Sequence, residues 1–446
     1  MLVIVIAAFS WLMWQRRPRI QQDDDLGSVH VYPAWVRQQG FMFLFSGDAG
    51  WTASDAAVAM HYARNGYYVA GIDTRRFLEV HRKDTDCVYL PGMLEGFSSD
   101  QQRNAGTHNY QEPVVLGHDA GATLVYMAQL QAPPLAFAAT AGLNPEPQIT
   151  LHPAFCDHKA ASSSSDLQTI AVEPLNPNVP LRIWNDSHAS ASSKAFVSSI
   201  NAKGKSFNEP DKPLYDAYQT ALNDINAERL KNGVADLPVV EVQPAKVTTD
   251  SYAIIYSGDG GWRDLDQTLA GILADRGMPA VGVDVLRYYW HNKSPLLGAH
   301  DLARIIRYYD AQWHRNKVIL IGFSFGGNVL PFLYNRLPAE LRAQVQLVSL
   351  LSPERTTAFE VDPRNWLGVE TDKGRVPIEP ELKQMPANMV QCIYGEDEHD
   401  DSLCTLPGAA AAHVLRKSGG HHFDENYDQL ASDILALLHS PQDTSQ

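Results

Sequence analysis

The sequence has 446 residues, of which 45% are hydrophobic and 20% are charged. This composition is typical of a folded chain of two or three domains and excludes general disorder. The 36 Lys and Arg residues and 51 Asp and Glu residues give a net charge of −15, which argues against a nucleic-acid binder and against general adhesion to anionic lipid. Four cysteines, at positions 87, 156, 392 and 404, are too few for a zinc ribbon or a dense disulfide scaffold.

Residues 1–26 are predicted to be a hydrophobic signal or anchor segment with a spacer. Met1–Trp14 carries no charge, and arginines follow it within residues 16–19. A helix of this length spans about 21 Å, which is less than the ~30 Å hydrocarbon core of a bilayer. The segment therefore fits the hydrophobic part of a signal peptide, a short membrane anchor or a buried terminal helix. Gln21–Leu26 is expected to be a solvated spacer.

Three motifs occur twice in the same order. The matching pairs are FMFLFSGDAGW at 41–51 with YAIIYSGDGGW at 252–262, GYYVAGID at 66–73 with GMPAVGVD at 277–284, and VVLGHDAG at 114–121 with ILIGFSFG at 319–326. The first two pairs are 211 residues apart and the third is 205 residues apart. This period is far longer than that of a solenoid repeat, so the pattern indicates a duplicated domain of about 200 residues.

Strand and helix patterns alternate within each copy. In the second copy the expected strands are 253–257, 280–285, 317–322, 345–351 and 389–394, and the expected helices are 264–276, 297–313, 328–336 and 427–438. Such alternation predicts a mostly parallel sheet with helices on both faces. We expect an α/β protein with two tandem α/β-hydrolase-type domains, 27–240 and 251–440, joined near the polar segment Leu237–Asp250.

A G-x-S-x-G motif, Gly322–Gly326, lies between an expected strand and an expected helix of the second copy. In this context the motif is typical of a nucleophile elbow, whose glycines permit a sharp turn that exposes the serine hydroxyl. Ser324 is therefore the candidate nucleophile.

Such a serine needs a base that is oriented by a carboxylate, and hydrolases of this topology supply them in the order Ser, acid, His. An acidic run follows the strand that ends at Gly395, and its candidates for the acid are Glu398 first, Asp397 second, and Asp400 and Asp401. A histidine pair follows two glycines before the last helix. His421 is the expected base and His422 is the alternative.

An oxyanion hole needs two backbone N–H donors. Phe325, which follows the nucleophile, is expected to supply one, and the loop 257–262 is expected to supply the other from Asp259 or Gly258. We place Gly260, Trp262 and Tyr288 at the substrate, although core packing explains Tyr288 equally well. No Gly-Lys-Ser/Thr follows the glycines, so a phosphate-binding loop is disfavoured, and we expect neither a metal nor a cofactor.

The corresponding elbow of the first copy is Gly117–Gly121, with Asp119 in place of the serine. It resembles the elbow of epoxide hydrolases and haloalkane dehalogenases, which also need a late histidine. No histidine occurs between His188 and Asp250. The first copy is thus predicted to be a degenerate hydrolase domain retained for docking or substrate presentation, with an aspartate-dependent enzyme as the alternative.

The cysteines fall two in each copy, so Cys87 with Cys156 and Cys392 with Cys404 are candidate disulfides, and four free cysteines are the alternative. Pairing would be consistent with an oxidising compartment, and the second bridge would brace the acidic loop.

Four motifs of the second copy, in this order, resemble the AcvB/VirJ family of bacterial virulence-associated proteins. They are SGDGGW with Leu265-Asp266, GFSFGGNVLPF at 322–332, CIYGEDEHDDSLC at 392–404 and GGHHFDENY at 419–427. The preceding degenerate copy is similar to the long, AcvB-like form. In this resemblance Ser324 falls on the family elbow and His421 on its GGHH motif.

The resemblance implies a periplasmic hydrolase, associated with or anchored to the inner membrane, that removes lysine or alanine from aminoacylated phosphatidylglycerol. Its expected partners are this lipid, the inner membrane surface and secretion-system proteins, and nucleic acid is not among them. The N-terminus departs from the family because no clear signal peptide is visible. A general carboxylesterase or lipase and a non-catalytic type IV secretion factor are the alternatives.

Overall fold

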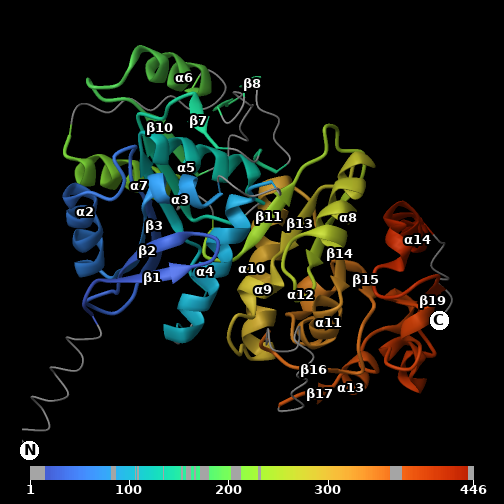
Figure 1. The fold of residues 1–446 in the computed structure, drawn as a ribbon. Helices are drawn as coiled ribbons and strands as arrows, with labels where there is room; N and C mark the ends of the chain where they lie inside the picture. Colours follow the sequence, from blue (N-terminus) through green and yellow to red (C-terminus); the bar gives the residue numbers. More distant parts are fainter. Residues whose placement is uncertain are drawn as a thin grey trace, which may run out of the picture. The chain divides into compact units, whose positions relative to one another are not determined.

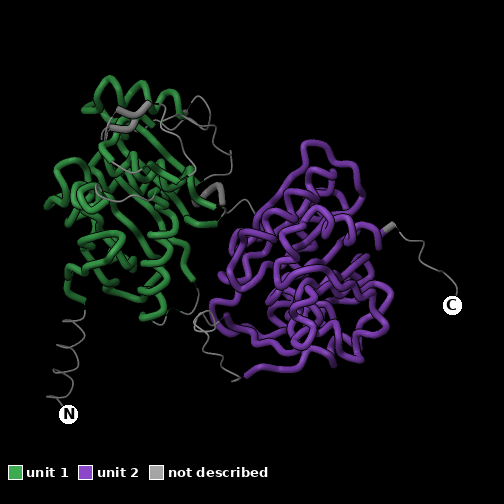
Figure 2. The backbone as a smooth tube through the Cα atoms, turned by 45° about the vertical axis from the view of Figure 1, so that its right-hand side comes forward, with its two compact units in different colours: residues 1–231 green, residues 232–446 purple. Residues whose placement is uncertain are grey.

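The computed structural model describes two compact units, residues 1–231 and 232–446 (Figure 2). The described residues are 16–81, 87–105, 107, 110–133, 135–151, 154–156, 162–164, 167–170, 180–201, 212–229, 233–361 and 374–439. The hydrophobic segment 1–14 lies outside them. No helix among the described residues combines the length and hydropathy that crossing a bilayer requires.

Unit 1 is built on a seven-stranded sheet (Figure 1). Its strands, in spatial order, are β1 (Arg19–Asp23), β2 (Gly27–Tyr32), β4 (Tyr67–Ile72), β3 (Gly40–Phe45), β5 (Val114–His118), β6 (Ala139–Leu143) and β10 (Leu181–Trp184). The pairings β1–β2 and β2–β4 are antiparallel, and the others are parallel. A small sheet contains β7 (Gln148–Thr150), β9 (Leu167–Thr169) and β8 (Ser162–Ser164). The helices are α2 (Ala53–Arg64), α3 (Thr74–Val80), α4 (Leu90–Ala105), α5 (Ala120–Gln131), α6 (Ala191–Asn201) and α7 (Leu214–Arg229).

Unit 2 repeats this plan with a second seven-stranded sheet. Its order is β11 (Val239–Val242), β13 (Ala280–Val283), β12 (Ser251–Tyr256), β14 (Lys317–Phe323), β15 (Val345–Leu351), β18 (Val390–Gly395) and β19 (His413–Lys417). Only the β11–β13 pairing is antiparallel in this sheet. The helices are α8 (Asp264–Asp275), α9 (Val285–Tyr288), α10 (Pro295–Trp313), α11 (Phe325–Asn335), α12 (Ala339–Arg342), α13 (Glu379–Leu382) and α14 (Tyr427–His439). The short strands β16 (Thr356–Thr357) and β17 (Val376–Pro377) pair antiparallel in a separate small sheet. The predicted α/β class, with two mostly parallel sheets, is confirmed.

The boundary between the units lies earlier in the chain than the sequence predicts. The structure divides at 231/232, and β11 hydrogen-bonds to β13 in the sheet of unit 2. We expected residues 27–240 to form the first domain and Leu237–Asp250 to be a linker. The prediction of a linker over β11 was wrong because the prolines on either side of this four-residue strand hid its Val-Val-Glu-Val pattern.

Two crossovers place helices on opposite faces of the sheet in unit 2. The chain passes from β12 through α8 to β13 and then through α10 to β14, which lies on the other side of β12. Because such crossovers are right-handed, the reversal of direction puts α8 and α10 on opposite faces. Accordingly α8 packs against α14, whereas α10 packs against α11. The carboxyl ends of β12 and β14 therefore form the switch point where α/β proteins bind ligands.

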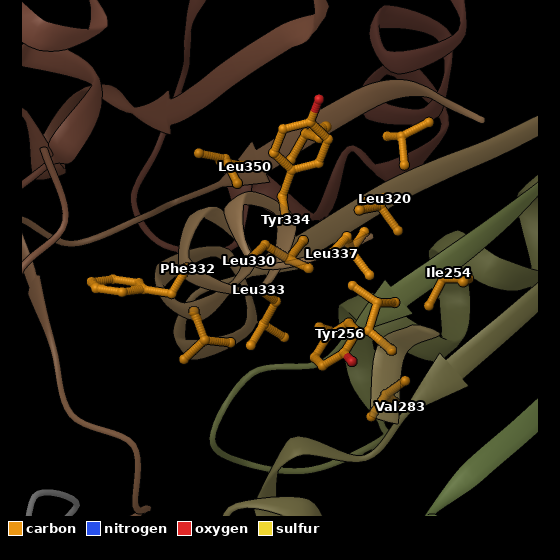
Figure 3. Packing of buried hydrophobic residues seen from close by; sticks show 14 of the residues in the cluster. Ile254, Tyr256, Val283, Leu320, Leu330, Phe332, Leu333, Tyr334, Leu337 and Leu350 are labelled. Carbon is orange, nitrogen blue, oxygen red and sulfur yellow. The ribbon is translucent and has the colours of Figure 1, made fainter. Parts of the chain in front are cut away.

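Local sequence explains both ends of α10. Ser294 caps the N-terminus of α10 by accepting the Leu297 N–H, Pro295 occupies its first turn, and His314 ends it in the left-handed conformation. The apolar side chains of α11 enter the main core of unit 2. Leu330 and Leu333 of α11 belong to the same buried cluster as Tyr256 of β12 (Figure 3).

Candidate active site

Ser324 occupies a sharp turn between β14 and α11. Its φ of 50° and ψ of −117° are unusual for a residue other than glycine, and its side chain is largely buried. Gly326 permits this turn, because a Cβ at that position would lie 2.2 Å from the carbonyl oxygen of Tyr256. The local geometry is that of the predicted elbow, with Ser324 at the carboxyl edge of the parallel sheet.

Glu398 and His421 are hydrogen-bonded to each other across two loops that follow neighbouring strands. Glu398 follows β18, His421 follows β19, and Oε1 of Glu398 lies 2.5 Å from Nδ1 of His421. Burial opposes ionisation of Glu398, but the hydrogen bond and positive charge of His421 outweigh it, so the pKa of this carboxyl lies below its ordinary value. Such a pair leaves Nε2 of the imidazole to act on a nucleophile.

The histidine is held against the elbow. The rings of His421 and Phe323, the residue before Ser324, lie 4.9 Å apart. Ser352, which follows β15, donates its hydroxyl to the carbonyl oxygen of His421 at 3.2 Å. Gly395 allows the loops of the acid and the base to approach, because a Cβ there would lie 2.3 Å from the carbonyl oxygen of Gly420.

The other candidates for the acid and the base have different surroundings. Asp397 is exposed, and its backbone N–H donates to the carbonyl oxygen of Gly419. Asp400 contacts His399, at 3.0 Å, and His422 is exposed and contacts the hydroxyl of Tyr427. Among these candidates, Glu398 and His421 are the acid and the base that are hydrogen-bonded to each other.

The loop after β12 lies directly beside the nucleophile. A Cβ at Gly258 would lie 3.7 Å from the Cβ of Ser324. The N–H of Gly258 donates to Oδ2 of Asp266 at 3.2 Å, so it is not directed to an oxyanion as one of our alternatives proposed. The backbone N–H groups of Phe325 and Asp259 are still the predicted donors of the oxyanion hole.

Two residues that the sequence placed at the substrate are core residues. Trp262 is 3% exposed and packs on Gly282, where a Cβ would lie 2.3 Å from the ring. Tyr288 is also buried and donates its hydroxyl to Asp301 at 2.7 Å. These placements were wrong because an aromatic residue after a strand satisfies both core and pocket patterns. Gly260 is half-buried in the loop.

Both predicted disulfides are present. Cys392 of β18 is bonded to Cys404, and Cys87 is bonded to Cys156. The Cys392–Cys404 bridge spans the acidic loop that carries Glu398 and ties this loop to β18.

The elbow of unit 1 has a different set of partners. Asp119 has nearly the backbone conformation of Ser324, with φ 50° and ψ −124°. Nδ1 of His118 lies 3.0 Å from Asp119, and its Nε2 lies 2.8 Å from the buried Asp55. Despite burial, the two carboxylates raise the pKa of His118 to about 9. His118 therefore links the elbow carboxylate to a second carboxylate.

The described residues of unit 1 contain no strand equivalent to β19, the strand that precedes His421 in unit 2. There the sheet ends at β10, which occupies the position of β18, and no counterpart of β19 follows. His188, which follows β10, is exposed and lies 3.7 Å from Asp186. The non-catalytic role of the first copy stays a prediction.

Sequence reasoning gave no role to His118, to Ser352 or to the two corresponding buried aspartates, Asp55 and Asp266, although Asp266 lies in the first family motif. The repeat contained a signal for the pair, because the two aspartates are also 211 residues apart. Ser352 had no such signal, since its contact with His421 depends on how β15 and β19 end. Among the described residues, no cluster of His, Cys, Asp or Glu is arranged to hold a metal ion.

Solved structures similar to this chain include several hydrolases. A lipase-esterase related protein from Clostridium acetobutylicum ATCC 824 is 18% identical, with a TM-score of 0.35, over 45% of this chain and 99% of the other. A proline iminopeptidase from Mycobacterium smegmatis is 13% identical, with a TM-score of 0.32, over 45% and 93%. The esterase domain of a Rhodothermus marinus protein is 14% identical, with a TM-score of 0.32, over 45% and 91%.

A comparison with curated proteins finds no match. The family model described as bacterial virulence protein (VirJ) matches residues 250–442. This range includes β12, the elbow, the Glu398–His421 pair and α14, and it confirms the resemblance seen in the four motifs. Residues 250–442, which are less than half of the chain, are therefore similar to the VirJ family of bacterial virulence proteins.

Proposed function

We propose that unit 2 is a serine hydrolase that cleaves the aminoacyl ester of aminoacylated phosphatidylglycerol. The observation that carries this proposal is the Glu398–His421 hydrogen bond beside the elbow of Ser324. A nucleophile, an acid and a base in this chain order supply covalent acyl transfer without a cofactor. The substrate class is an expectation from the family resemblance.

The chemistry proceeds in two halves. Ser324 Oγ attacks the aminoacyl carbonyl carbon while Nε2 of His421 takes the hydroxyl proton, and Glu398 stabilises the imidazolium. The backbone N–H groups of Phe325 and Asp259 would stabilise the oxyanion. The glycerol oxygen then leaves with the proton from His421 as intact phosphatidylglycerol. Water attacks the acyl-enzyme by the reverse sequence and releases the amino acid.

Acidic side chains beside this edge suit a substrate that carries an ammonium group. Asp264 at the start of α8 and the run Glu396–Asp401 are exposed or half-buried. A carboxylate close to the ester would attract the ammonium of the aminoacyl group. The same ammonium withdraws electrons from the carbonyl and makes this ester more reactive than an ordinary one.

The two disulfides support a periplasmic location, because disulfides persist in oxidising compartments. In this proposal the enzyme acts at the inner membrane surface, where its lipid substrate lies, and unit 1 docks or presents the lipid. Secretion-system proteins are further proposed partners.

The test is turnover of lysyl- and alanyl-phosphatidylglycerol in detergent micelles, followed by lipid chromatography. We expect wild type to convert both or one of them to phosphatidylglycerol, and Ser324→Ala to lose at least about 10³-fold in rate. Asp119→Asn, at the corresponding elbow of unit 1, is the matched control and should retain activity.

Two results would contradict the proposal. Equal turnover by wild type and Ser324→Ala would exclude this nucleophile. Hydrolysis of p-nitrophenyl esters with no turnover of either lipid would instead indicate a general carboxylesterase.

A further inference from the structure

Asp55 and Asp266 are a duplicated pair of buried carboxylates. Each is the third residue of the helix that follows a glycine loop, α2 in unit 1 and α8 in unit 2. Asp55 is 0% exposed and Asp266 is 2% exposed. A buried carboxyl group is costly unless it is hydrogen-bonded, so the partners of each aspartate show what it does.

In unit 1 the carboxylate is fully paired. Asp55 accepts the backbone N–H of Thr52 at 2.8 Å and its hydroxyl at 2.6 Å, which completes a capping box for α2. Its other oxygen contacts Nε2 of His118 at 2.8 Å. The pKa of Asp55 lies below its ordinary value because these contacts outweigh the effect of burial.

Unit 2 has lost both kinds of partner. Arg263 replaces Thr52 and makes no side-chain cap, and Phe323 replaces His118 before the nucleophile. Within the described part of the chain, Oδ1 of Asp266 has no hydrogen-bonding partner. Burial raises the pKa of Asp266 well above its ordinary value, which favours a neutral carboxyl group.

The contact that Asp266 makes with another residue reaches the catalytic loop. Its Oδ2 accepts the N–H of Gly258 at 3.2 Å, and Gly258 faces both the ring of Phe323 and the Cβ of Ser324. A Cβ at Gly258 would lie 3.2 Å from that ring, so the loop has little room to move toward the elbow. The hydrogen bond from Gly258 to Asp266 opposes movement of the loop away from the elbow.

We propose that Asp266 is a positioning residue that anchors the Gly258 N–H and thereby fixes the loop 257–262 against Ser324. With Gly258 anchored, the following N–H of Asp259 stays in register with that of Phe325 for the developing oxyanion. The role requires a hydrogen-bond acceptor and no negative charge. This inference rests on the proposed hydrolase function and identifies a further residue of the same site.

The first experiment compares kcat and KM of wild type, Asp266→Ala and Asp266→Asn on p-nitrophenyl acetate and on the aminoacyl lipid. We expect Asp266→Ala to lower kcat by roughly 10- to 100-fold with KM changed by less than about threefold. Asp266→Asn keeps the acceptor and should recover most of kcat. Asp55→Ala removes the equivalent carboxyl in unit 1 and should leave kcat unchanged.

A transition-state analogue gives a second readout of the same hole. A trifluoromethyl ketone forms a hemiketal oxyanion with the serine, so its inhibition constant should weaken with Asp266→Ala by about the same factor as kcat/KM. If Asp266→Ala does not fold, Asp266→Leu fills the site without an acceptor and is measured in the same way.

Three outcomes would overturn the inference. They are an unchanged kcat in Asp266→Ala, a loss in Asp266→Asn as large as in Asp266→Ala, and equal amide hydrogen exchange at Gly258 in wild type and Asp266→Ala. Exchange is measured on the full chain by mass spectrometry and does not depend on turnover. An inactive wild type with the expected exchange difference would instead contradict the proposed function alone.

Discussion

Glu398 and Asp397 are adjacent carboxylates with different surroundings, and this difference assigns the acid of the proposed triad. Glu398 bonds to His421, whereas Asp397 is exposed and makes a backbone contact with Gly419. We expect Glu398→Gln to lower kcat by roughly 10²- to 10⁴-fold, because the amide cannot stabilise an imidazolium. Hydrolysis of p-nitrophenyl acetate measures this loss.

The pH profile adds a condition to that prediction. Because the pKa of Glu398 lies below its ordinary value, its carboxylate is ionised at every pH above about 5. Ionisation of Glu398 should therefore add no step to the pH–rate profile of the wild type between about pH 5 and pH 8. Asp397→Asn is the matched control. A loss of kcat in Asp397→Asn as large as in Glu398→Gln would contradict the assignment of Glu398 as the acid.

His118 in unit 1 makes stability depend on pH. Its pKa is raised from 6.5 to about 9 in the folded chain, so the paired imidazolium stabilises unit 1 fully below pH 6.5 and this contribution is lost as pH rises through 9. The shift corresponds to roughly 3 kcal/mol. Urea unfolding of wild type and His118→Gln should show a difference at pH 6 that shrinks by about pH 9. A difference that is constant or grows with pH would contradict the pairing with Asp55 and Asp119.

At the scale of elements, the disulfide Cys392–Cys404 joins β18 to the end of the loop that carries the proposed acid. The loop between the cysteines is short, and closing a loop of this size stabilises a fold by roughly 3 kcal/mol. We expect the double substitution Cys392→Ala with Cys404→Ala to lower both the unfolding midpoint and kcat, because Glu398 loses its brace. Thermal unfolding and ester hydrolysis measure the two effects.

The bridge of unit 1 is the control for this prediction. Cys87→Ala with Cys156→Ala should lower stability and leave kcat unchanged, since Cys87 and Cys156 lie in the other unit. Similar losses of kcat in both double variants would mean that the Cys392–Cys404 bridge acts through global stability and not through the acidic loop.

The sequence predicted the elements around the elbow well because their signals are local. Val345–Leu351 is a strand with the predicted bounds, and the glycines of 322–326 can only serve a tight turn between a strand and a helix. The Glu398–His421 pair was also accessible, because chain order and strand ends limit the choices. Trp262 and Tyr288 were misplaced because burial depends on tertiary packing, which a single aromatic residue does not reveal. The partners of Asp266 follow from the same packing and could not be predicted.

At the scale of the whole molecule, the duplication produced two units with one plan and different sites. Both keep the switch point, the strained elbow residue and the buried aspartate of the first helix. In unit 1 the elbow carboxylate is paired with His118, and in unit 2 the serine lies beside an independent acid and base. The same backbone thus supports an ion-paired elbow in one copy and a proposed nucleophile in the other.

The division at 231/232 predicts which fragment of the chain keeps the activity. Residues 233–446 contain the whole sheet of unit 2, including β11, and all residues of the proposed triad. Residues 251–446 lack β11, so β13 would become an exposed edge strand with unpaired backbone groups. We expect 233–446 to be soluble and to hydrolyse p-nitrophenyl acetate with a kcat within about threefold of the full chain.

The shorter fragment tests the role of the edge strand. Fragment 251–446 should unfold at a lower denaturant concentration than 233–446 and should aggregate more readily, because β13 can pair with other chains. Size-exclusion chromatography and urea unfolding compare the two. Equal stability of the fragments would show that β11 contributes nothing to unit 2, and an inactive 233–446 that is folded would show that unit 1 is required for the chemistry itself.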